Sequence, residues 1–198
     1  AVGFAALHEA PGCFIIPNPW DAGSARILAG LGYKAMATTS SGFANTLGRT
    51  DYQAGRENVM DHIRSVAPLV DIPMTGDLEN GFGNRPEECA ETIRMSAEAG
   101  LVGGSIEDAT GDASDPIYAM DVAIERIRAA AEAARDLPFR YMLTARCENY
   151  LHGRADLADT IARLQAYQEA GADVLFAPGL NTADEIRTVC TEVDRPVN

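Results

Sequence analysis

The chain has 198 residues, of which 46% are hydrophobic, enough for the core of one compact domain. Its formal net charge of −13 argues against nucleic acid or an anionic membrane as a partner, because both need clustered Lys and Arg. The sequence shows no transmembrane run and no signal-peptide pattern, and its four cysteines are far apart, so we expect a reduced, cytoplasmic protein.

A pattern of helix, Ala-Gly and apolar strand recurs along the sequence. It occurs three times, at Ala29-Gly30, Ala99-Gly100 and Ala170-Gly171, each time shortly before an apolar segment. A glycine just after a helix adopts the left-handed conformation that satisfies the last carbonyl groups. A short apolar strand that follows directly is typical of a parallel sheet. The pattern therefore predicts repeated βα units.

The predicted elements alternate along the whole chain. After a helix that ends near Ala10, we expect strands near Cys13–Ile16, Lys34–Thr38, Pro73–Asp77, Gly103–Glu107, Arg140–Arg146 and Asp173–Ala177. We expect helices near Ala22–Leu31, Ala54–Val70, Arg85–Ala99, Tyr118–Arg135, Leu157–Ala170 and Ala183–Val193. Three helix starts are marked by capping residues, namely Asn84, Asp156 and Thr182.

Strict alternation of strands and helices is typical of a (β/α)₈ TIM-type barrel or of an open doubly wound sheet. The first βα turn has no GxGxxG motif, which weakens the open-sheet interpretation. Polar and acidic residues gather where several strands end, the place at which barrel enzymes carry their chemistry. We therefore predict one barrel domain over residues 1–198 with about six of the eight βα units. We expect the domain to be truncated before the seventh strand, whose entry we place at residues 195–198.

Acidic residues follow three consecutive predicted strands. Asp77 and Glu79 come at the end of one strand, Glu107 and Asp108 close the next, and Asp51 lies in an earlier loop. Residues i and i+2 of a strand point to the same side, and neighbouring strands are ~5 Å apart, so these carboxylates can converge. Crowded carboxylates need a cation, and such oxygen ligands suit Mg²⁺, with Mn²⁺ as the alternative. The other interpretation is that they are solvated loop residues or helix caps.

Further polar residues surround the predicted metal site. Arg146 closes a strand and is either a clamp for a substrate carboxylate or the partner of an acid in a structural ion pair. Small residues at Thr39 and Ser40 allow backbone amides to approach an anion, or form an ordinary polar turn. Trp20 either lines the mouth of the barrel or packs. His152 is either a proton-transfer group or a loop residue.

These motifs are similar to those of the isocitrate lyase/phosphoenolpyruvate mutase superfamily, over nearly the whole chain. The most specific segments are Gly76-Asp77-Leu78-Glu79-Asn80-Gly81-Phe82-Gly83, Ser105-Ile106-Glu107-Asp108 and Thr144-Ala145-Arg146. Leu47-Gly48-Arg49-Thr50-Asp51 matches a further family segment in form. The resemblance implies that Asp77 binds Mg²⁺ directly, while Asp51, Glu79 and Glu107 hold its waters. It also implies that Arg146 binds the substrate carboxylate and that amides around Thr39 and Ser40 receive a carboxylate or enolate oxygen. A homo-oligomer of the full-length protein is implied as well.

Two departures from the family pattern bear on the metal site and on the reaction, and a third is that Ala177-Pro178-Gly179 offers no His or Glu after the sixth predicted strand. The usual Asp-x-Asp is Asp77-Leu78-Glu79, and the extra methylene still permits a water-mediated contact. The segment 109–116 reads Ala-Thr-Gly-Asp-Ala-Ser-Asp-Pro, without the Cys, His and Lys of the lyases or the Lys and Asn of the mutases. The sequence therefore argues against isocitrate and methylisocitrate as substrates, and it weakens phosphonopyruvate chemistry.

The sequence thus predicts a Mg²⁺-dependent enzyme that acts on a small 2-oxo carboxylate through an enolate-like intermediate. We expect a C–C lyase, decarboxylase or hydrolase in which Arg146 and Asp51 are catalytic. A phosphoenolpyruvate or carboxyphosphonoenolpyruvate mutase-type enzyme is the first alternative. The second is a non-catalytic protein that binds 2-oxo acids.

Overall fold

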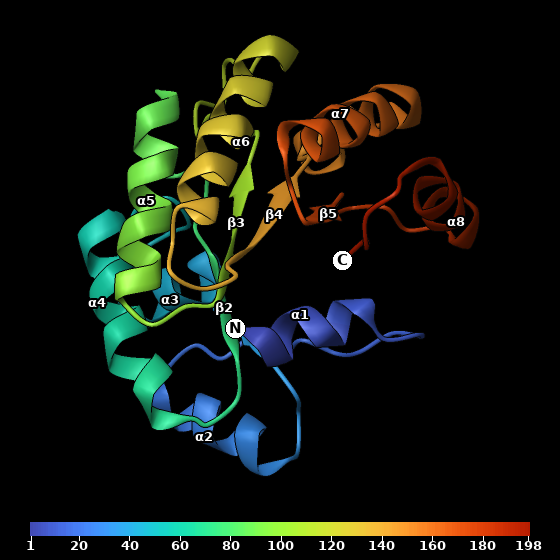
Figure 1. Cartoon of the computed structure of the whole chain (residues 1–198). Helices are drawn as coiled ribbons and strands as arrows, with labels where there is room; N and C mark the ends of the chain where they lie inside the picture. Colours follow the sequence, from blue (N-terminus) through green and yellow to red (C-terminus); the bar gives the residue numbers. More distant parts are fainter.

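Five short parallel strands form the centre of the molecule, in the spatial order β1-β2-β3-β4-β5 (Figure 1). The computed structural model describes residues 1–198. The strands are β1 (Met36–Ala37), β2 (Met74–Asp77), β3 (Gly103–Glu107), β4 (Met142–Arg146) and β5 (Val174–Phe176). Each pairs with the next strand along the chain, which is the arrangement of a partial (β/α)₈ barrel and confirms the predicted fold class.

The helices connect the strands, and most of them cover the outside of the sheet. They are α1 (Val2–Glu9), α2 (Ala22–Gly30), α3 (Ser40–Thr46), α4 (Arg56–Val66), α5 (Pro86–Glu98), α6 (Met120–Arg135), α7 (Leu157–Ala170) and α8 (Ala183–Glu192). Two 3₁₀ turns, η1 (Ala67–Leu69) and η2 (Asn149–His152), complete the set. The main core of apolar side chains lies between these helices and the strands. None of the helices combines the length and apolar character needed to span a bilayer.

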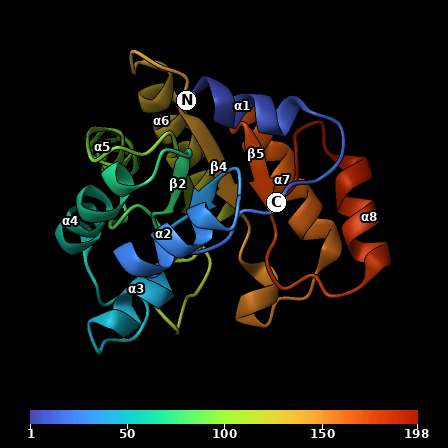
Figure 2. The same cartoon turned by 90° about the horizontal axis from the view of Figure 1, so that it is seen from below.

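Helix α1 does not belong to the outer layer. It lies across the ends at which the strands begin (Figures 1 and 2). Phe4 and Ala5 of this helix pack in a second, small core with Ala35, Met142 and Val174, which stand at or just before the starts of β1, β4 and β5. The amino-terminal end of the partial barrel is thereby closed with apolar side chains, and polar chemistry is left to the other end.

Several predicted boundaries are correct to within two residues, and others are wrong. The predicted strand Cys13–Ile16 does not form. The main hydrogen bond to this segment runs from the Ala37 N–H to the Pro17 carbonyl, and Pro17 and Pro19 have no N–H to donate. The segment is therefore extended but not part of the sheet. The polar segment 38–42 is not a turn, because α3 begins in it with the Thr39 side chain as its cap.

Predicted helix ends were corrected at three places. Arg85, not Asn84, caps α5, and the Asn84 side chain instead accepts a hydrogen bond from Tyr118 Oη at 2.6 Å. The helix predicted to run to Val70 ends at Val66 and continues only as η1, which contains Pro68. Gly30 is still helical, and Gly32 has the positive φ of 87° instead. The caps at Asp156 and Thr182 are confirmed.

The chain's last residues begin the next pairing of the sheet. Val197 forms an isolated parallel bridge with Leu175 of β5. The Leu175 N–H donates to Pro196 at 2.9 Å, and the Asn198 N–H donates to Leu175 at 2.8 Å. The predicted entry to a seventh strand at residues 195–198 therefore lies at the edge where a further strand of a barrel would stand.

Gly104 allows close packing at the middle of the sheet, and we predict that Gly104→Ala destabilises the fold by about 1–3 kcal/mol. A Cβ there would lie 2.4 Å from Tyr141 Oη and 2.6 Å from Leu78 Cδ1, and both side chains are buried. Urea denaturation measures the change. The matched control is Gly3→Ala on α1, where nothing lies within 4 Å. Equal stability of the two variants would contradict this account of the packing.

Candidate active site

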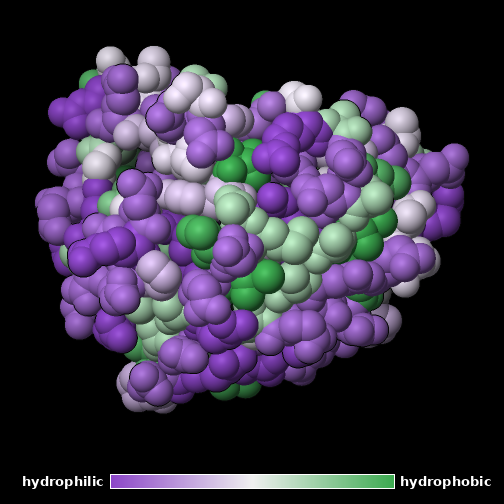
Figure 3. All heavy atoms as spheres, turned by 90° about the horizontal axis from the view of Figure 1, so that it is seen from above, coloured by the Kyte–Doolittle hydropathy of each residue, from purple (hydrophilic) through white to green (hydrophobic).

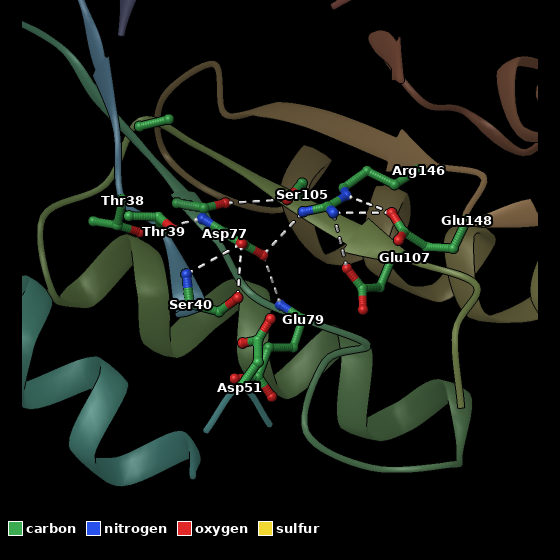
Figure 4. A network of polar contacts seen from close by, with 12 residues as sticks. Thr38, Thr39, Ser40, Asp51, Asp77, Glu79, Ser105, Glu107, Arg146 and Glu148 are labelled. Carbon is green, nitrogen blue, oxygen red and sulfur yellow. Dashed lines mark hydrogen bonds and ion pairs between the residues drawn. The ribbon is translucent and has the colours of Figure 1, made fainter. Parts of the chain in front are cut away.

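Polar side chains from four segments meet where the strands end. Asp77 closes β2, Glu107 closes β3, Arg146 closes β4, and Ser40 starts α3 after β1 (Figure 4). Parallel pairing places Glu107 directly beside Arg146 in the register of β3 and β4. These residues line a cavity of about 410 Å³. Its other lining residues are Thr39, Ser41, Asp51, Tyr52, Glu148, Leu151 and His152.

The Arg146 guanidinium is the centre of this cluster. Its Nη1 lies 3.2 Å from Asp77 Oδ1, and its Nη2 lies 3.4 Å from Glu107 Oε2. Glu148, two residues further along the chain, receives Nη2 at 2.9 Å and Nε at 3.0 Å. Burial works against the charged arginine, but the three carboxylates outweigh it and raise its pKa. In this arrangement Arg146 forms ion pairs with three acids. This is the second of the two roles that the sequence left open for it, beside binding a substrate carboxylate.

Asp77 is held on both oxygens. Its Oδ2 accepts from the Ser40 N–H at 3.1 Å and from the Ser40 hydroxyl at 2.9 Å. Its Oδ1 faces Arg146 and also accepts from the Glu79 N–H at 3.2 Å. The Ser40 amide, predicted to receive a substrate oxygen, is thus bonded to Asp77, and the Thr39 side chain caps α3.

Glu79 reaches the site by a different route from the one expected. Strand β2 ends at Asp77, and Glu79 has a φ of 50°, so strand alternation does not position it. Its carbonyl accepts from the Glu107 N–H at 3.1 Å, which ties the turn to β3. The side chain is 3% exposed, and its Oε1 has no hydrogen-bond partner. Burial and the nearby charges of Asp51 and Asp77 raise its pKa to about 8.

Three other acids of the cluster, Asp51, Glu107 and Glu148, are also shifted toward the protonated form. Burial raises the pKa of Glu107 and of Glu148, although Arg146 counteracts both. Asp51 has an exposed side chain, but surrounding atoms still desolvate its carboxyl and raise its pKa, as does the Asp77 charge. A single arginine therefore does not neutralise these acids, and the remaining repulsion favours a bound cation.

The donor set fits a hydrated divalent ion better than a closed cage. No three His, Cys, Asp or Glu side chains of the chain converge as direct ligands. One or two carboxylates with retained waters are the usual environment of Mg²⁺. The unpartnered Glu79 Oε1 and the carboxylates of Asp77 and Glu107 supply acceptors for such an ion and its waters.

The stability of the metal-free protein is expected to fall by about 1–3 kcal/mol as the pH rises from 5 to 8. Because Glu79 has a raised pKa when folded, the folded state keeps a proton that the unfolded chain releases above its ordinary pKa, so stability decreases until the folded group titrates near pH 8. Urea denaturation in EDTA across this range measures the slope. Glu79→Gln should reduce the slope and Mg²⁺ should oppose the loss, whereas stability rising over this range would contradict the assignment.

Trp20 lies behind the site and does not line the cavity. A Cβ at Gly42 would come within 2.7 Å of its indole ring, so the ring packs on the start of α3, and its side chain remains half exposed. His152 does line the cavity, from η2. Two further residues at the site, Glu148 and Tyr52, were not among those singled out from the sequence.

The segment 109–117 forms a closed hairpin beside the cavity. Ala109 and Ile117 form an antiparallel bridge, and the Thr110 N–H donates to Pro116 at 2.9 Å. The Thr110 hydroxyl donates to Asp115 at 2.6 Å, and the Asn80 side chain donates to the Thr110 carbonyl at 3.1 Å.

In the view from above, hydrophilic residues predominate on the surface of the molecule around a band of hydrophobic ones (Figure 3).

Known proteins share this fold. A structure from Burkholderia cenocepacia J2315, thought to be a lyase or mutase, is 60% identical with a TM-score of 0.97, covering 99% of this chain and 70% of that one. Oxaloacetate acetylhydrolase, solved with its product oxalate, is 26% identical with a TM-score of 0.91, covering 100% of this chain and 70% of that one.

Curated protein sequences are also similar to this chain. The 2-methylisocitrate lyase of Escherichia coli (strain K12) is 30% identical over 174 residues, which are 84% of this chain and 57% of that protein. The family model described as phosphoenolpyruvate phosphomutase matches residues 4–198. The chain therefore belongs to the phosphoenolpyruvate mutase family, within the isocitrate lyase/phosphoenolpyruvate mutase superfamily.

Proposed function

We propose that this chain carries the site of a Mg²⁺-dependent enzyme that cleaves a C–C bond of a small 2-oxo acid. The observation that carries the proposal is the convergence of Asp77, Glu107 and Arg146 in a polar cavity at the strand ends, with the buried Glu79 beside them. The reaction would pass through an enolate-like intermediate, as a lyase, decarboxylase or hydrolase. Family membership supports this class, because its members include lyases and an oxaloacetate hydrolase.

The residues have distinct roles in this proposal. Asp77 would hold the cation directly, and Asp51, Glu79 and Glu107 would hold its waters. When bound, Mg²⁺, with Mn²⁺ as the alternative, polarises the 2-oxo group and offsets negative charge that develops on it. Asp51 also belongs to the catalytic set, as its exposed carboxyl lines the cavity.

Substrate binding would fall to Arg146, Thr39 and Ser40, with Trp20 supporting the start of α3. Arg146 would turn some of its donors from the carboxylates toward the substrate carboxylate, with the planar geometry that suits it. The amides and hydroxyls of Thr39 and Ser40 line the same cavity and are placed to meet an anionic oxygen.

The hairpin 109–117 argues against two more specific activities, cleavage of methylisocitrate and chemistry on a phosphonate. It has no Cys, Lys or His, so it offers no nucleophile or acid of the kind found in methylisocitrate lyases and no lysine for a phosphonate group. A P–C mutase is retained as the alternative within the family, since the most similar structure described above is assigned to lyases or mutases. A protein that binds 2-oxo acids without turnover is the alternative outside catalysis.

The proposal is tested by incubating the full-length protein and Mg²⁺ with a panel of 2-oxo acids and following the products by NMR. We expect EDTA-sensitive C–C cleavage of a 2-oxo carboxylate. Formation of a phosphonate from phosphoenolpyruvate would support the mutase instead. Tight binding without any product would support the non-catalytic alternative.

A further inference from the structure

Tyr52 stands at the edge of the candidate active site, in the loop between α3 and α4. It follows Asp51 directly, is half-buried and lines the same cavity as Asp77 and Glu107. We propose that Tyr52 is a positioning residue, which fixes the Glu107 carboxylate and closes one side of the cavity against the hairpin 109–117. The proposal rests on the proposed function, because it assigns Tyr52 to the same metal-dependent site.

The phenol supplies a hydrogen bond that Glu107 otherwise lacks. Tyr52 Oη donates to Glu107 Oε1, while the second oxygen, Oε2, faces Arg146 Nη2 at 3.4 Å. The Glu107 side chain is 5% exposed, so water has little access to the first oxygen. A buried carboxylate oxygen without a donor is costly, and the phenol therefore fixes the orientation of the Glu107 carboxyl group.

The aromatic ring makes a second contact, with the hairpin. A Cβ built on Gly111 would lie 3.4 Å from Tyr52 Cδ1 and 3.7 Å from Cε1, so the ring rests against the backbone of that glycine. The hairpin is closed by its own hydrogen bonds, including Thr110 to Pro116, and is tied to the turn after β2 through Asn80. Tyr52 thus joins three separate segments, its own loop, the end of β3 and the hairpin, at the wall of the cavity.

The backbone of Tyr52 is strained. Its φ is 63°, in the left-handed region that bulky side chains rarely adopt and glycine adopts readily. Such a conformation persists only where surrounding contacts hold it, and it concentrates at functional sites. The side-chain contacts with Glu107 and Gly111 stabilise this backbone conformation. If its only role were to turn the chain, glycine would serve better.

Three variants of the full-length protein test this role, with oxalate as the probe. Oxalate is a small dicarboxylate that oxaloacetate acetylhydrolase binds as its product. Isothermal titration calorimetry in excess MgCl₂ measures oxalate affinity, and thermal unfolding in EDTA measures stability without metal. Tyr52→Phe removes only the hydroxyl, and Tyr52→Gly removes the side chain and the strain. Tyr33→Phe removes a phenol in the loop between α2 and β1 and is the matched control.

We expect Tyr52→Phe to weaken Mg²⁺-dependent oxalate binding by about tenfold, as loss of a partner of a metal-site residue commonly does. Tyr52→Gly should bind oxalate at least as weakly as Tyr52→Phe and yet unfold in EDTA at a temperature equal to or above that of Tyr52→Phe, because both variants lose the donor to Glu107 and only glycine relieves the backbone strain. Tyr33→Phe should bind as the wild type does. Weaker binding by Tyr52→Gly without any loss of stability beyond that of Tyr52→Phe is a result that a purely structural role of the ring would not give.

Two outcomes overturn the proposal, and they are distinguishable. If both Tyr52 variants bind oxalate as tightly as the wild type while Asp77→Ala does not bind it, Tyr52 has no positioning role and the proposed function stands. If the wild type itself shows no Mg²⁺-dependent binding of oxalate and no turnover of 2-oxo acids, the proposed function fails and this proposal fails with it.

Discussion

Replacing Asp77 with Asn should lower Mg²⁺-dependent turnover by at least about 10³-fold. Asp77 is the carboxylate at the end of β2, and its two oxygens meet Ser40 and Arg146. Asparagine keeps the size of the side chain and one acceptor oxygen but removes the negative charge that would hold the cation. Turnover and Mg²⁺ affinity, measured by calorimetry, should therefore fall together while the circular dichroism spectrum stays unchanged.

The matched control for this variant is Asp71→Asn. Asp71 is an exposed aspartate just before β2, at the opposite end of the same strand. It loses the same charge from the protein without approaching the cavity, so its turnover should equal that of the wild type. An Asp77→Asn enzyme that keeps more than a tenth of its turnover would show that Asp77 does not hold an essential cation.

Much of the fold could be predicted because local signals agree with each other. Helix α7 begins and ends where expected, since Asp156 caps its start and Gly171, with a φ of 112°, ends it. Strand β3 also matches its predicted range. In α7 the hydrophobic pattern, the cap and the turn residue indicate the same boundaries, and in β3 the apolar run follows directly on the helix end at Ala99-Gly100. Such agreement makes a prediction reliable.

Helix α3 could not be predicted, because its stability comes from distant contacts. It has seven residues, including two serines and a glycine, and such a short polar segment has little helical tendency of its own. Phe43 of this helix stacks on His62 of α4, with ring centroids 4.1 Å apart. Ser40 at its start is bonded to Asp77. These partners are brought together only by the completed fold.

The expectation that site residues follow the ends of strands identified the main acids and Arg146, but it did not identify Glu148 and Tyr52. Glu148 lies two residues after Arg146, the same spacing that drew attention to Glu79 after Asp77, so a signal for it existed in the sequence. Tyr52 gave no such signal. Its approach to Glu107 depends on a left-handed backbone and on a hairpin from another part of the chain.

Glu79 shows that a correct location can follow from a wrong reason. Strand alternation placed it beside Asp77, but the strand has ended by then and a turn with positive φ brings it inward. The turn is fixed by the hydrogen bond from the Glu107 N–H to the Glu79 carbonyl. The turn that carries the longer glutamate side chain is thus tied to β3 as well as to Asp77 of β2.

Arg146→Lys should raise the KM for the 2-oxo acid by about 10–100-fold. Lysine keeps the positive charge but loses the planar fork that contacts Asp77, Glu107 and Glu148 together. A carboxylate of the substrate needs the same fork for two parallel hydrogen bonds. Steady-state kinetics at saturating Mg²⁺ measure KM and kcat, and urea denaturation measures the accompanying loss of stability.

Arg163→Lys separates the two roles that Arg146 can have. Arg163 is more deeply buried, with 4% of its side chain exposed against 14% for Arg146, and it contacts Asp108 at 3.2 Å and Asp159 at 2.8 Å without lining the cavity. Its replacement should lower stability by about 1–3 kcal/mol and leave KM unchanged. If Arg146→Lys behaves in the same way, Arg146 is a structural ion-pair partner. If KM rises for Arg146→Lys alone, the guanidinium binds substrate in addition to pairing with the acids around it.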